Sequence, residues 1–73
     1  MLLIKRQVSV CYISGMNLRL QRQAAGISQK GLCDLIRAAT GLEITQMQIS
    51  RWENSFEFGV EPVIAYAIKK ILS

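Results

Sequence analysis

The segment from Thr45 to Asn54 constrains the fold more than any other stretch of this 73-residue chain. Thr45 is a residue type that caps helix starts, and Gln48 completes a capping box. If the helix turns by about 100° per residue, Ile49 and Trp52 share one side and can enter a core. Folding does not require the side chains of the opposite face, which are mainly hydrogen-bonding groups: Gln46, Met47, Ser50, Arg51 and Asn54.

Three other segments show the spacing and the boundaries of helices. We expect one over about residues 16–25, ended by Gly26, and a second that Ser28 caps and Gly41 ends. The last begins near Pro62, because proline is favoured in the first turn of a helix. With the segment above, these make four helices. The side chains at core-facing spacing are Leu32, Leu35, Ile36 and Ala39 in the second helix, and Val63, Ile64, Ala67, Ile68, Ile71 and Leu72 in the fourth.

Residues 1–15 do not join this helical pattern. Apolar and small side chains alternate from Val8 to Tyr12, which predicts a short strand. No partner strand is evident in the chain, so this strand would lie on the helices, pair with a second chain or be disordered. The sequence therefore predicts an N-terminal extension, 1–15, and a helical domain, 16–73. The expected fold class is all-α, a compact four-helix domain with a short N-terminal extended segment.

The composition gives little support to catalysis. The chain has no histidine, its five acidic residues are scattered, and Cys33 has no neighbour that would activate its thiol. No nucleophile and base can be paired, so we expect no enzymatic activity. The two cysteines do not have the spacing of a metal site, and we expect neither a metal nor another cofactor.

Charge and hydropathy indicate the compartment of the protein and the kind of partner that it binds. The net charge is +4 and the pI is near 9.5, which modestly favours an anionic partner. No apolar run is long enough to cross a bilayer, and no signal-peptide cleavage site follows the apolar residues near the N-terminus. We therefore expect a cytoplasmic protein with reduced cysteines and no membrane partner.

Two stretches, taken together and in this order, resemble one known family. They are Leu18-Arg19, Arg22 and Gly26-Ile27-Ser28-Gln29, followed by Ile49-Ser50-Arg51-Trp52-Glu53-Asn54. They are similar to the Xre/Cro-type, lambda-repressor-like helix-turn-helix proteins, a family of bacterial and phage repressors. The resemblance covers about residues 16–72. It implies a sequence-specific DNA-binding transcriptional regulator that places helix 46–54 in the major groove of double-stranded DNA.

The resemblance also assigns roles to individual side chains. Gln46, Met47 and Arg51 match positions that read bases, where Gln suits adenine and Arg suits guanine. Met47 would touch thymine methyl groups or, alternatively, fill a gap in the core. Gln29 matches a residue that bonds a phosphate and braces the recognition helix. The full set of expected DNA contacts is Gln29, Thr45, Gln46, Met47, Gln48, Ser50, Arg51 and Asn54, of which Thr45, Gln48 and Asn54 match positions near phosphates or bracing positions, and Ser50 is open to either role.

Other matched residues are expected to be structural or electrostatic. Arg22 and Glu53 match the family's internal ion pair, which ties the first helix to the end of the third. Trp52 is expected in the core or at its rim. Charge near the DNA backbone would come from Arg19, Lys30 and Arg37.

The chain departs from the family pattern in two places. The spacing from Gln29 to Ile49 is about six residues longer, and the unbroken apolar pattern predicts that the second helix continues to about Thr40. After Asn54 the family commonly has glycine and basic residues, whereas residues 55–61 here are acidic and aromatic. Phe56 and Phe58 are not both expected in so small a core.

These observations favour a DNA-binding regulator that works as a homodimer, with no small-molecule ligand. A dimer is expected because one such domain buries too small an interface for tight specific binding. It would pair through the N-terminal segment, the 56–58 loop or the fourth helix. The main alternative is a protein-interaction module, such as an antitoxin or an accessory subunit, whose fold does not read DNA. A membrane-active peptide is disfavoured, because no helix carries a dense basic face.

Overall fold

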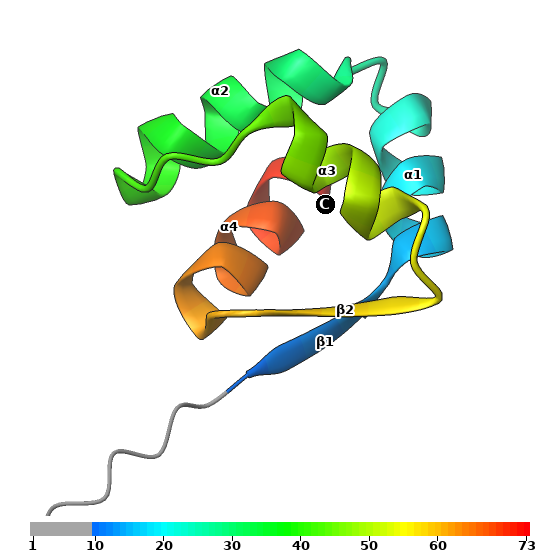
Figure 1. The fold of residues 1–73 in the computed structure, drawn as a ribbon. Coiled ribbons are helices and arrows are strands. Elements are labelled where there is room, and N and C mark those ends of the chain that lie inside the picture. Colours follow the sequence, from blue (N-terminus) through cyan, green and yellow to red (C-terminus); the bar gives the residue numbers. More distant parts are fainter. Residues whose placement is uncertain (1–9) are drawn as a thin grey trace, which may run out of the picture.

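Helices make up most of the computed structural model, which describes residues 10–73 (Figure 1). The elements in chain order are β1 (Cys11–Ser14), α1 (Gly15–Ala24), α2 (Gln29–Thr40), α3 (Gln46–Glu53), β2 (Glu57–Val60) and α4 (Pro62–Leu72). The expected four helices are therefore confirmed. None of the helices in this part of the chain is long and apolar enough to cross a membrane.

The helix boundaries follow local side-chain and backbone chemistry. Ser28 Oγ accepts a hydrogen bond from the Gly31 N–H at 2.9 Å, which caps the start of α2. Gly41 ends the same helix with a left-handed φ of 75°, and its N–H donates to the Arg37 carbonyl. The prediction that α2 extends to about Thr40 is thus confirmed. The longer spacing before α3 is one extra stretch of helix followed by a short connection.

The fold also contains a small sheet, which corrects the expectation of a strand without a partner in the chain. β1 pairs with β2 in antiparallel fashion, with Cys11 opposite Val60 and Ser14 opposite Glu57. The sheet thus joins the start of the described chain to the segment after α3. β1 lies within the predicted N-terminal extension, and α1 already begins at Gly15. The first part of the predicted strand, Val8 and Ser9, lies outside the described residues.

The core lies where the helices meet the inner face of the sheet. Leu18, Leu32, Ile36 and Ile49 are fully buried, and Phe58 is buried from β2. Trp52 is half-buried and stacks on Phe58, with ring centroids 4.9 Å apart. The remaining buried apolar residues are Cys33, Val60, Ile64, Ala67 and Ile68.

Three residues expected in the core are exposed instead. Leu35 and Val63 are 42% and 46% exposed, and Ala39 is also exposed. Ala39 and Val63 line the groove between α2 and α4, so these parts of the two helices are open to solvent. The apolar spacing correctly groups these side chains on one face, but that face extends past the core to the surface.

Candidate nucleic-acid interface

The outward face of α3 carries the side chains that were expected to read bases. Gln46, Met47 and Arg51 are all exposed. Met47 is 65% exposed, so the alternative that it fills a gap in the core is wrong. Within residues 10–73, neither the Gln46 side chain nor the Arg51 side chain makes a hydrogen bond or an ion pair. Their polar groups are therefore available to a partner.

The start of α3 is held by a reciprocal cap. The Gln48 N–H donates to Thr45 Oγ1 at 3.1 Å, and the Thr45 N–H donates to Gln48 Oε1 at 3.0 Å. Both residues are exposed to solvent. The two residues thus fix the first turn of the helix and leave its N-terminal end open to solvent.

The other end of α3 is fixed by Asn54. The Arg19 guanidinium donates to Asn54 Oδ1 at 2.9 Å, and Asn54 Nδ2 donates to the Ser50 carbonyl at 2.8 Å. The sequence predicts only a charge near the DNA backbone for Arg19 and does not indicate this link, because the two residues lie 35 positions apart. Asn54 therefore braces α3 against α1. The half-buried Ser50 side chain makes no hydrogen bond in the described part of the chain.

One buried carboxylate connects α1, α2 and α3. Arg22 donates to Glu53 through Nε at 2.6 Å and through Nη2 at 3.0 Å, so the expected ion pair is confirmed. Gln29 Nε2 donates to Glu53 Oε1 at 3.2 Å, and Arg19 Nε lies 3.6 Å from the same oxygen. Arg22 also donates to the Ile27 carbonyl at 2.8 Å, beyond the end of α1. The bracing role expected of Gln29 is therefore present.

Electrostatics keep this cluster charged. Burial by itself raises the pKa of the Glu53 carboxyl, but hydrogen bonds from Arg22 and Gln29 and the charges of Arg22 and Arg19 outweigh it. The pKa of Glu53 consequently lies below its ordinary value. The hydrogen bond to Glu53 also raises the pKa of Arg22. Since two arginines surround one carboxylate, the cluster keeps an excess positive charge beside α3.

The remaining expected cations lie on α2. Lys30 is exposed in its first turn, and Arg37 is exposed near its C-terminal end. Arg37 Nη2 lies 3.6 Å from Asp34 Oδ1, so part of its charge is offset on its own helix. Lys30 follows Gln29 of the Glu53 cluster directly in sequence. Its charge is offset less than that of Arg37.

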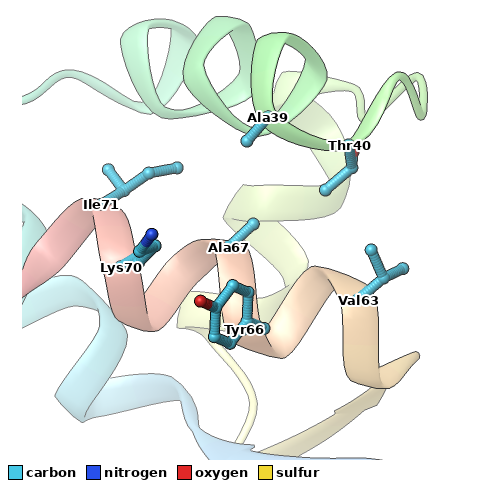
Figure 2. Close-up of a pocket in the computed structure, with 7 residues that line it drawn as sticks. All are labelled: Ala39, Thr40, Val63, Tyr66, Ala67, Lys70 and Ile71. Carbon is cyan, nitrogen blue, oxygen red and sulfur yellow. The ribbon is translucent and has the colours of Figure 1, made fainter.

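A groove of about 390 Å³ lies between α2 and α4. Figure 2 shows Ala39 and Ala67 at its floor, with Tyr66 and Lys70 on the α4 side and α3 behind both helices. The groove therefore opens on the face opposite α3. The described residues contain no group of three or more metal-ligating side chains. Burial raises the pKa of the Cys33 thiol, which disfavours a reactive thiolate.

Comparisons with protein-family models, with curated proteins and with solved structures found no match for this chain.

Proposed function

We propose that this protein is a sequence-specific DNA-binding transcriptional regulator of the helix-turn-helix type, a repressor of the phage, prophage or plasmid kind. The observation that carries the proposal is the contrast within α3. Ile49 and Glu53 are buried and hold the helix in place, while Gln46, Met47 and Arg51 are exposed on its other side. This arrangement leaves a short row of hydrogen-bonding and apolar groups on a firmly held helix.

In this proposal α3 enters the major groove and α2 crosses the DNA backbone. Gln46 and Arg51 have the donors and acceptors for base edges, and Met47 has the apolar surface that suits a thymine methyl group. Thr45, Gln48 and Asn54 hold the two ends of α3 and lie near phosphates. Their chief contribution is then to position the helix, because their side chains already have partners within the domain.

Gln29 provides a phosphate contact of the proposal, and the arginines beside Glu53 add positive charge near the DNA backbone. Gln29 uses one amide hydrogen on Glu53 and keeps a second for a phosphate oxygen. Arg19 has a side chain that is 42% exposed and lies at the C-terminal end of α3. Because the Glu53 cluster has excess positive charge, it favours an anionic backbone at this edge.

The test begins with a selection from random duplex DNA, followed by affinity measurements on the enriched site. Arg51→Ala is expected to cost about 1–3 kcal/mol of binding free energy and to relax specificity at one base pair. Lys69→Ala is the matched control, because it removes one exposed positive charge from α4, away from α3. Its affinity is expected to stay near that of the parent. Equal affinities of the parent and Arg51→Ala would refute base reading by this residue.

A second candidate function is a protein-interaction module that does not read DNA. It is favoured by the apolar surface along α2 and α4, where Leu35, Val63 and Tyr66 are exposed. A salt titration separates the two candidates. A DNA-binding protein loses affinity steeply as salt rises, whereas an interaction module shows no DNA binding even at low salt.

A further inference from the structure

The turn between α3 and β2 presents an aromatic side chain to solvent. Phe56 is 94% exposed, more than any other large hydrophobic residue in the described chain, and Met16 nearby is 68% exposed. Both line an open groove of about 400 Å³ that also includes Ser14, Arg19 and Asn54. An exposed phenylalanine beside a groove has the form of an interface anchor.

The backbone holds this turn in one conformation. Ser55 Oγ donates to the Arg51 carbonyl at 2.7 Å, and the Gly15 N–H donates to the Phe56 carbonyl at 3.3 Å. Gly15 allows this close approach, because a Cβ there would collide with the carbonyl oxygens of Ser55 and Trp52. Phe56 is therefore presented by a well-anchored turn, which lowers the entropy cost of using it in a contact.

Opposite charges flank the apolar centre of this surface. Arg19 lines the groove from α1. Glu57 is exposed at the start of β2 and lies opposite Ser14, which lines the groove as well. A surface with both signs around an apolar centre is complementary to itself, since a two-fold axis can bring each Glu57 to the Arg19 of the other copy.

The position of the turn distinguishes it from the groove between α2 and α4. That groove opens on the face opposite α3 (Figure 2), so pairing there would direct the two α3 helices away from each other. The turn at Phe56 directly follows the C-terminal end of α3 (Figure 1). Pairing there can keep both α3 helices on one side, as a two-fold DNA site requires.

We propose that the surface formed by Met16, Arg19 and the turn Ser55-Phe56-Glu57 pairs two copies of this chain. The proposal rests on the proposed function, because a two-fold DNA site supplies the need for two α3 helices on one side. It assigns a role to the acidic and aromatic turn, which is one of the two places where the sequence departs from the resembled family. The occupant of the groove beside Phe56 is the same turn of the second copy.

The first experiment measures self-association of the full chain without DNA by sedimentation equilibrium, and then binding to DNA with one or two half-sites. Phe56→Ala is expected to weaken self-association, and cooperative binding to two half-sites, by roughly tenfold or more. Tyr66→Ala is the matched control, because Tyr66 is a 63% exposed aromatic residue on α4. Tyr66→Ala should associate as the parent does. At concentrations where the parent is a monomer, both variants should melt with the parent, which a thermal scan checks.

A second pair of variants tests the charges. Glu57→Lys is expected to weaken self-association, because it places a lysine opposite Arg19 of the other copy. Glu61→Lys makes the same change in net charge at the far end of β2 and should leave self-association unchanged. Equal effects of the two variants would show that only net charge matters and would overturn the assigned pairing.

The remaining outcomes separate this surface from DNA binding. Equal self-association of the parent and Phe56→Ala overturns the proposal, as does a parent that stays monomeric and binds two half-sites without cooperativity. Loss of affinity for a single half-site with cooperativity intact places Phe56 on DNA and also overturns it. A chain that pairs through Phe56 but binds no DNA supports this surface and refutes the proposed function.

Discussion

The two faces of α3 differ in how the rest of the molecule uses them. The inner face places Ile49 in the core and joins Glu53 to Arg22, Gln29 and Arg19. The outer face presents Met47 and Arg51 to solvent. A helix built in this way can change its outer residues without a loss of fold. The comparison therefore predicts that stability and recognition are carried by separate side chains of one short helix.

The largest expected effect is on the inner face. Glu53→Ala should lower the free energy of unfolding by about 3–5 kcal/mol, because it leaves the Arg22 guanidinium without its partner in a largely buried site. Urea denaturation followed by circular dichroism measures the loss. Glu43→Ala is the control, since that carboxylate is exposed, and it should stay close to the parent. Similar losses in the two variants would mean that the burial of Glu53 does not determine its contribution to the free energy of unfolding.

The same carboxylate predicts a direction for the pH dependence. Because the pKa of Glu53 in the folded state lies below its ordinary value of 4.5, its contribution is present above that value. The contribution is lost as the pH falls from there through the folded-state pKa. Unfolding free energies measured on the acid side should therefore fall more steeply for the parent than for Glu53→Gln. Parallel pH profiles would contradict the lowered pKa.

A pair of substitutions compares the two faces directly. Ile49→Ala should cost about 2–5 kcal/mol of stability, because the side chain is fully buried. Met47→Ala removes a side chain of similar size from the exposed face and should change stability by less than about 0.5 kcal/mol. Met47→Ala should weaken binding to the selected DNA site, although its melting temperature should stay that of the parent. A large loss of stability in Met47→Ala would remove the distinction between the faces.

The smallest of these effects concerns the start of α3. Thr45→Ala removes the hydroxyl that accepts the Gln48 N–H and should cost about 1 kcal/mol. Thr45→Ser keeps the hydroxyl and should restore most of the loss. Thermal unfolding of the two variants measures the difference. If both variants match the parent, the cap does not limit stability, and the inner face alone holds α3.

Much of the helical layout could be predicted because its signals are local. Ser28, Gly41, Thr45 and Pro62 act on the backbone within a few residues of themselves, so their positions define helix ends without knowledge of the fold. The link between Arg22 and Glu53 was inferred from the family resemblance. The hydrogen bond from Arg19 to Asn54 was not, because it depends on how α1 and α3 pack.

The sheet was missed for a different reason. β2 consists of Glu57-Phe-Gly-Val60, and glutamate and glycine are both disfavoured in strands. Its strand conformation depends on pairing with β1, which is distant in sequence, and on burial of Phe58 against Trp52. Leu35 and Val63 illustrate a related limit. Apolar periodicity identifies which residues share a face, but not whether another element covers that face.

The single carboxylate of Glu53 has a consequence for the motions of the domain. Since Glu53 of α3 binds side chains of both α1 and α2, neither of these helices can detach at this junction without breaking its contact to α3, and α3 cannot detach without breaking both. Amide hydrogens in the second half of α1, the first turn of α2 and the end of α3 should therefore exchange with solvent as one cooperative unit. The outer turn at Gly41, which is far from this carboxylate along both neighbouring helices, should exchange independently and faster.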